Sequence, residues 1–106
     1  MQGDDVMKII KHYIRSTKNF YTVNFNGIVI YFSYSTPVAI KDGDTLYVSQ
    51  NYWSTTTGKH LFWIEDSYGR DYNLQVRKGK RLSSKEFTAI RNKYGIPDTV
   101  ERLSVA

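Results

Sequence analysis

Apolar residues near the start of the chain recur with the spacing of one helix face. The apolar positions i, i+3, i+4, i+7 and i+8 are Val6, Ile9, Ile10, Tyr13 and Ile14. They predict a helix over residues 4–17 that buries this face. A second face of the same helix is basic, and it is either solvated or in contact with a polyanion. Its residues are Lys8, Lys11, His12 and Arg15.

Two alternating apolar segments flank Asn26-Gly27 between residues 20 and 34. An Asn-Gly pair is a strong hairpin signal, because a type I′ turn needs positive φ at both central positions. A two-residue loop there places six apolar side chains on one face, so the turn and the pattern agree on the register. The predicted pairs are Phe25 with Ile28, Val23 with Ile30, and Tyr21 with Phe32.

A second hairpin follows around Asp42-Gly43, between alternating apolar residues that begin at Val38 and end at Val48. A two-residue loop would pair Ile40 with Thr45 and mix the two faces. A three-residue loop with a left-handed Gly43 restores the match. We therefore expect a bulged loop, and an antiparallel meander of about four strands in all.

Residues 54–65 are open to two interpretations. Ser54 is a good N-cap, and Leu61 and Ile64 are spaced to face the core from a helix. Three threonines and a glycine are poor helix formers, so a loop followed by a strand is the alternative. We favour the helix.

The best-defined helix covers residues 83–94. Ser83 and Glu86 match a capping box, and Gly95 supplies the left-handed residue that ends many helices. Before this helix, the alternation from Tyr72 to Val76 predicts a short strand. After it, the tail has the spacing of one more helical turn.

The length of 106 residues fits one domain, so we take residues 1–106 as a single domain. Cysteine is absent, which excludes disulfides and thiolate metal sites. No apolar run approaches the roughly 18 residues that a membrane span needs, so no membrane contact and a cytoplasmic location are expected. The expected fold class is α+β: an N-terminal helix, an antiparallel meander of about four strands, and two later helices packed on one face of the sheet.

The net charge of +5 favours a polyanionic partner or an acidic protein surface. The first candidate contact is Ser54–His60, where hydroxyl and basic side chains at a helix start would converge on a phosphate. The phosphate-loop spacing G-x-x-x-x-G-K-[ST] is absent, which excludes nucleotide hydrolysis. In the structural alternative, Ser54 only caps the helix and Lys59 is solvated. The candidate contact residues are Thr55, Thr56, Lys59 and His60.

The second candidate is the densest basic cluster, residues 77–81, together with an arginine upstream. Arg and Lys around a glycine suit phosphate contacts that give affinity without sequence choice. A solvated loop is the alternative. The candidate residues are Arg70, Arg77, Lys78, Lys80 and Arg81.

Catalysis has little support in the sequence. No Ser–His–Asp set is evident. A turn accounts for Asp42 and Asp44, and Glu65 and Asp66 lack histidines placed as metal ligands. We expect no enzymatic activity, no cofactor and no metal.

Three segments of the chain belong together: residues 31–39, residues 51–61, which contain Trp-Ser-x-Thr-Thr-Gly-Lys-His-Leu, and residues 81–87. Together they resemble a small uncharacterised domain of bacteriophage and mobile-element proteins. The likeness covers roughly residues 22–95. It implies a viral or mobile-element accessory protein that acts inside a bacterial cell.

These observations predict a non-enzymatic protein, monomer or homodimer, that binds the DNA or RNA backbone in the bacterial cytoplasm. The alternative is a host-directed inhibitor that binds a bacterial protein, such as a defence complex or a nucleic-acid enzyme. Exposed aromatic side chains would then anchor the interface. The candidate anchors are Tyr52, Trp53 and Tyr68.

Overall fold

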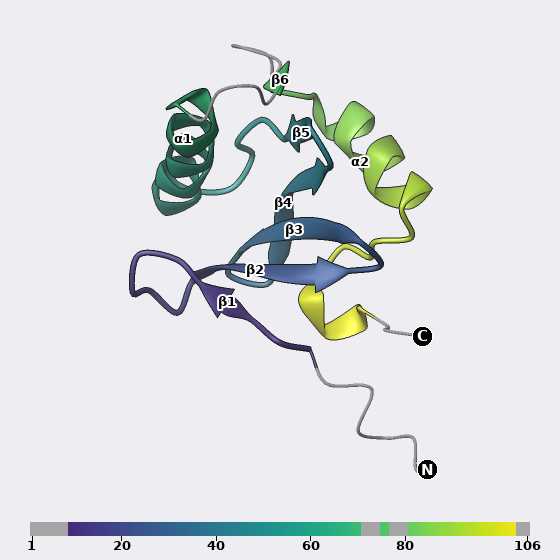
Figure 1. Cartoon of the computed structure of the whole chain (residues 1–106), viewed down its shortest axis with the longest axis horizontal. Coiled ribbons are helices and arrows are strands. Elements are labelled where there is room, and N and C mark those ends of the chain that lie inside the picture. Colours follow the sequence, from purple (N-terminus) through teal and green to yellow (C-terminus); the bar gives the residue numbers. More distant parts are fainter. Residues whose placement is uncertain (1–8, 71–74, 77–80, 104–106) are drawn as a thin grey trace.

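The computed structural model describes residues 9–70, 75–76 and 81–103, with the backbone alone for residues 68–70 and 75–76. Five strands come first, then a helix, a short strand, a second helix and a 3₁₀ turn (Figure 1). Their bounds are β1 His12–Tyr13, β2 Phe20–Phe25, β3 Ile28–Ser33, β4 Thr36–Asp42, β5 Thr45–Val48, α1 Thr55–Arg70, β6 Gln75–Val76, α2 Ser84–Lys93 and η2 Val100–Arg102.

The described strands form one sheet in the order β1-β2-β3-β4-β5-β6. Strands β1 to β5 pair antiparallel with their sequence neighbours, whereas β6 lies parallel to β5. A parallel pair needs a long crossover connection, and α1 supplies it. The sheet together with α1 and α2 confirms the predicted α+β class, and α1 confirms the helix favoured for residues 54–65. The meander has five strands rather than about four.

The first predicted hairpin is confirmed in its register. Phe25 pairs with Ile28, and the ladder continues to Tyr21 opposite Phe32. Asn26 and Gly27 both take positive φ, at 50° and 85°, as the two-residue turn requires.

The second hairpin differs from its prediction. Gly43 does take a positive φ of 58°, but Asp42 pairs directly with Thr45. The loop is therefore Gly43-Asp44, one residue later than the Asp42-Gly43 loop considered from the sequence. This shift pairs Ile40 with Tyr47, which removes the need for a bulge at the turn.

The bulge lies instead in β4, at Val38. Tyr31 pairs with Ala39 and Phe32 pairs with Pro37, so Val38 has no direct partner in β3. Val38 and Ala39 both join the core beneath α1, and Ile40 joins the core on the other face. The strand is thus buried on both faces, as is usual for strands covered by helices on both sides.

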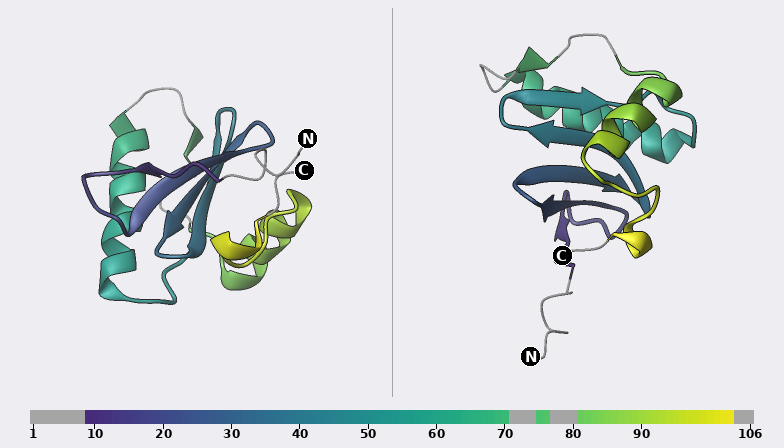
Figure 2. Two further views of the ribbon diagram at one scale, coloured as in Figure 1. Left: turned by 90° about the horizontal axis from the view of Figure 1, so that it is seen from below. Right: turned by 90° about the vertical axis from the view of Figure 1, so that its right-hand side faces the viewer.

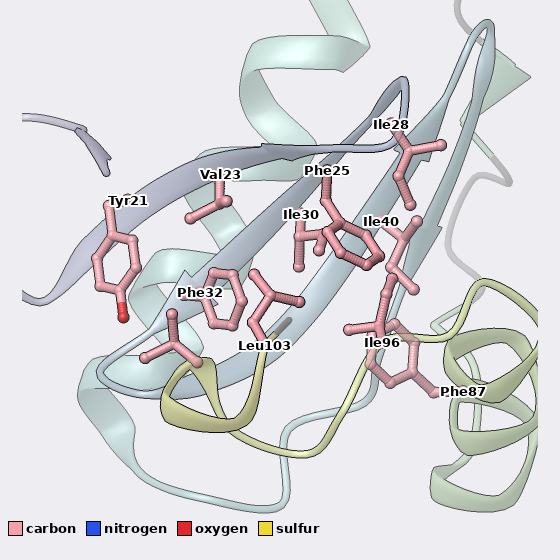
Figure 3. Packing of buried hydrophobic residues seen from close by; sticks show 11 residues of the cluster. Tyr21, Val23, Phe25, Ile28, Ile30, Phe32, Ile40, Phe87, Ile96 and Leu103 are labelled. Carbon is pink, nitrogen blue, oxygen red and sulfur yellow. The ribbon is translucent and has the colours of Figure 1, made fainter. Parts of the chain in front are cut away.

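Two clusters of buried side chains cover the two faces of the sheet. One packs side chains of β2 and β3 against Phe87 of α2 and against residues 96–103 (Figure 3). The other packs Phe20 and neighbouring strand residues against Leu61 and Ile64 of α1. The sheet therefore lies between the two helices (Figure 2). The prediction that both helices pack on one face is wrong, because both faces of the sheet are apolar and each needs a cover.

The predicted N-terminal helix is also wrong for the residues that the structure describes. His12 and Tyr13 form an edge strand opposite Thr22 and Tyr21. Pairing there satisfies backbone groups of β2 that would otherwise be left at an open sheet edge. Ile10, placed in the buried stripe by the helical spacing, is 66% exposed. Residues 4–8 of the predicted helix lie outside the described ranges.

The second helix agrees with its predicted caps. The Ser83 hydroxyl accepts from the Glu86 N–H, and the Glu86 carboxylate accepts from the Ser83 N–H. At the other end Gly95 has a φ of 72°, and the N–H of Ile96 donates to the carbonyl of Arg91. This 6→1 bond belongs to a Schellman motif. The predicted extra turn is η2, whose Val100 is buried.

Adjacent residues of α1 test which of its faces is buried. We expect Leu61→Ala to lower the free energy of unfolding by about 2–5 kcal/mol, because the fully buried side chain leaves a cavity. Phe62→Ala, one residue later and exposed, should change it by no more than about 0.5 kcal/mol. Urea unfolding of both variants measures this. Equal effects would contradict the assigned face.

Candidate functional site

A tight corner before α1 fixes where the helix begins. The Asn51 side chain accepts from the Trp53 N–H at 2.9 Å and donates to the Ser54 carbonyl at 2.9 Å. Ser54 then caps the helix by accepting from the Thr57 N–H at 3.1 Å. A Cβ at Gly58 would lie 3.0 Å from the Asn51 amide nitrogen, so a larger residue there would push the Asn51 side chain by a few tenths of an ångström. The predicted N-cap role of Ser54 is confirmed.

A buried chain of hydrogen bonds connects this corner to the sheet. The Ser54 hydroxyl donates to Thr57 Oγ1 at 3.2 Å, Thr57 Oγ1 lies 2.9 Å from Ser33 Oγ, and Ser33 Oγ lies 2.6 Å from His60 Nδ1. One arrangement of protons that satisfies all three bonds has Thr57 donating to Ser33 and Ser33 donating to His60. His60 is then neutral, with its proton on Nε2.

His60 belongs to the core rather than to a binding surface. Its side chain is 2% exposed, and its ring stacks on Phe20 with centroids 4.6 Å apart and planes 2° apart. Burial lowers the pKa of His60, because the charged ring would lose its hydration. The hypothesis that His60 contacts a phosphate therefore does not fit the structure. The Ser33–His60 pair resembles a catalytic nucleophile and its base, but both side chains are buried, so a substrate could not reach them.

The other side of α1 faces solvent and keeps three of the predicted residues together. Thr55, Thr56 and Lys59 are exposed, and their helical spacing places them beside Phe62 and Trp63. Phe62 is 59% exposed, so most of this large apolar side chain is in contact with solvent. This surface also carries one acidic residue. We call it the α1 outer face, and it consists of Thr55, Thr56, Lys59, Phe62, Trp63 and Asp66.

The loop between β1 and β2, residues 14–19, adds a cation to this face. The guanidinium carbon of Arg15 lies 4.6 Å from the centre of the Trp63 ring, a cation–π contact. The Ile14 N–H donates to the Phe20 carbonyl at 2.9 Å and closes the loop. Arg15 and Ser16 both have positive φ, 55° and 57°, which is rare for residues other than glycine. No local pattern predicts this contact between residues 48 positions apart.

The predicted basic cluster lies largely outside the described residues. Arg77, Lys78 and Lys80 are not described, and Arg70 is described only as the last residue of α1. Arg81 is described, and its guanidinium holds Glu65 of α1 through two bonds, at 3.0 Å and 2.8 Å. This bond raises the pKa of Arg81. The described part of the cluster is thus already paired.

Arg81 also lies away from the helix start. Glu65 follows Thr55 by ten residues, which is roughly 15 Å along a helix. The helix start and Arg81 therefore do not form one compact anion site. Only an extended ligand would reach both.

Two of the three predicted protein-binding anchors border a hollow of about 270 Å³, which also includes Phe87 and Arg91 of α2. Tyr52 and Trp53 are half exposed, and their rings meet edge to face at 5.9 Å. The Tyr52 hydroxyl accepts from the Ser84 N–H at 2.6 Å, so Tyr52 also satisfies a free donor at the start of α2. The side chain of the third anchor, Tyr68, is not described.

A family of unknown function, DUF8033, matches residues 7–87. The chain belongs to the DUF8033 family. The matched range contains the β1–β2 loop, α1 and the buried Ser33–His60 network. No curated protein and no solved structure matches the chain.

Among the described residues of this DUF8033 protein, no group of three or more His, Asp or Glu side chains is placed to hold a metal ion. Over the same residues, no helix is both long and apolar enough to cross a membrane.

Removing the central hydroxyl of the buried network tests its contribution to stability. Ser33→Ala leaves His60 Nδ1 without its partner and removes one of the two hydroxyl partners of Thr57 Oγ1, so the free energy of unfolding should fall by about 1–3 kcal/mol. The control is Ser35→Ala, which removes an exposed bond to Glu101 and should cost less than about 1 kcal/mol. Urea unfolding at neutral pH compares the two variants. A Ser33→Ala protein as stable as the control would contradict the network.

The lowered pKa of His60 predicts acid sensitivity. The unfolded chain takes up the proton near the ordinary pKa of 6.5, whereas the folded protein takes it up only at lower pH. The stabilisation is therefore complete above pH 6.5 and is lost as the pH falls below it. Urea unfolding between about pH 7.5 and 5.5 should show this loss in the natural protein and in His12→Gln, but not in His60→Gln. A loss that persists in His60→Gln would assign it to another group.

Proposed function

We propose that this protein binds single-stranded nucleic acid on the α1 outer face, without catalysing a reaction. One observation carries the proposal: Arg15 is seated on Trp63, beside Lys59 and the exposed Phe62. A cation from the β1–β2 loop and a cation from α1 thus lie next to the half-exposed Trp63 ring and the exposed Phe62 ring. Single-strand binding sites combine these two features, because the cations follow the phosphates and the rings stack on bases.

The charges on this side are free to act on a ligand. Within the described part of the chain, Arg15, Lys18 and Lys59 form no ion pair with a carboxylate. By contrast, Arg81 and Arg102 are held by Glu65 and Asp98. The overall charge of +5 has the same sign and would attract a polyanion from a distance.

The start of α1 adds donors for phosphate. The backbone N–H groups of Thr55 and Thr56 have no acceptor among the described residues, and both hydroxyl side chains are exposed. Free N–H groups at a helix start favour an anion. These donors supplement Lys59, one turn further along the helix.

The exposed ring of Phe62 favours a single strand over a duplex. Burying it would be favourable, and an unpaired base offers a flat surface that can do so. Bases in a duplex are already stacked on one another. The ligand that fits this face is therefore a strand with accessible bases, either DNA or RNA.

The resemblance of three segments to a domain of bacteriophage and mobile-element proteins also implies an accessory role in such an element, within the cytoplasm of a bacterial host. We include this origin in the proposal. The alternative function is inhibition of a host protein. The hollow beside Tyr52 and Trp53 favours that alternative, because half-exposed aromatic side chains next to a concavity are typical protein-binding anchors.

Salt dependence of binding tests the proposal. A fluorescent oligothymidylate of about ten nucleotides should bind at low salt, and its affinity should fall steeply as salt rises. Replacing Arg15 and Lys59 together by Gln should reduce the slope of log affinity against log salt by about 1.4, or 0.7 for each lost contact. Asp66→Asn, which removes the acidic residue of the face, should strengthen binding.

The control is Lys93→Gln, which removes an exposed charge from α2 on the opposite side of the sheet. It should leave the salt slope unchanged. Absence of binding at low salt would dismiss the proposed function. If Lys93→Gln lowered the salt slope as much per charge as the Arg15 and Lys59 substitutions, binding would depend on the overall charge of the protein and not on the α1 outer face.

A further inference from the structure

A pocket of about 220 Å³ lies between the β1–β2 loop and α1. Its floor consists of the buried side chains Phe20, Tyr31 and Ile64. Its rim consists of Arg15, Trp63 and Ser67, which are exposed or half exposed. The pocket therefore opens to solvent beside the α1 outer face.

The walls suit a flat ring. The Phe20 and Trp63 rings are 5.9 Å apart and tilted by 43°, and Phe20 and Tyr31 are 6.3 Å apart and tilted by 33°. The volume is below the roughly 300–1,000 Å³ of sites for drug-sized ligands. It holds one small ring system rather than a helix or a lipid chain.

The rim favours a ring that carries a negative group. Arg15 stands at the mouth, and in the described structure its guanidinium bonds to no carboxylate. The Ser67 hydroxyl at the same rim offers a donor and an acceptor to the polar edge of a ring. A flat polar-edged ring joined to a phosphate is a nucleotide.

The backbone of the loop supports a role for Arg15. Two consecutive residues, Arg15 and Ser16, are held in the left-handed region, which residues other than glycine rarely adopt. Such conformations persist where the surrounding structure enforces them, and they concentrate at functional sites. Here they hold the guanidinium against Trp63 at the mouth of the pocket.

We propose that this pocket takes the base of one nucleotide of the bound strand, while Arg15 contacts the adjoining phosphate. The inference rests on the proposed nucleic-acid binding, and it adds which part of the ligand enters the protein and where. Phe62, Lys59 and the start of α1 would then contact the neighbouring nucleotides.

Two oligonucleotides with the same phosphates separate base insertion from charge attraction. One is an oligothymidylate of about ten nucleotides, and the other is its abasic counterpart. The natural protein should bind the first roughly 5- to 150-fold more tightly, the range expected for stacking of one base on aromatic side chains. Equal affinities would overturn the inference and leave standing only the binding of a strand through its phosphates. Failure to bind either strand at low salt would dismiss the proposed function itself.

A pocket-filling variant locates the effect. Ser67→Leu places a larger neutral side chain at the rim, and Ser67→Ala is the matched control that keeps the pocket open. Ser67→Leu should lose the preference for the base-containing strand, and its salt slope should match that of the natural protein. Ser67→Ala keeps the pocket open and loses only the rim hydroxyl, so it should still prefer the base-containing strand, by a smaller factor than the natural protein. A preference that survives in Ser67→Leu would place the base elsewhere and overturn the assignment of this pocket.

Discussion

The hydrogen bond between Ser33 and His60 fixes how α1 sits on the sheet. Both side chains are buried, and Thr57 joins them from one turn earlier in the helix. A buried polar group without a partner is costly, so the helix cannot rotate about its axis without breaking this set. The rotation of α1 in turn decides that Lys59 and Phe62 face solvent and that Trp63 meets Arg15. The proposed binding face thus depends on a bond inside the protein.

The sequence predicts the parts of the fold that local chemistry determines. The Asn26-Gly27 turn sets its own hairpin register, and the Ser83–Glu86 box sets the start of α2, because each needs only neighbouring residues. β1 forms through pairing with β2 and not through its own helical spacing, so periodicity alone led to the wrong element. The placement of α1 and α2 on opposite faces depends on the whole sheet. The unbroken apolar run at residues 37–40 in β4 is a local sign that both faces of the sheet are covered.

The candidate site was also predictable only where neighbouring residues determine it. Ser54 marks a helix start, but the pattern that follows does not itself say which hydroxyls face outward. Thr57, His60, Leu61 and Ile64 stand at i, i+3, i+4 and i+7, the spacing of a buried stripe, and this spacing would have placed His60 in the core. The contact of Arg15 with Trp63 had no local signal, because it joins a loop to a helix far along the chain.

Phe20 connects the buried network to the pocket. One face of its ring stacks on His60, and the same side chain forms part of the pocket floor with Tyr31 and Ile64. The floor is therefore held by core packing before any ligand arrives, which reduces the ordering cost of binding. The rim is different, because Arg15 belongs to an exposed loop, and among the described residues its guanidinium contacts a ring and no carboxylate. This combination suits a nucleic-acid strand. The fixed floor can take any base, because bases are alike in shape, and the Arg15 side chain can adjust to a phosphate backbone that follows different paths.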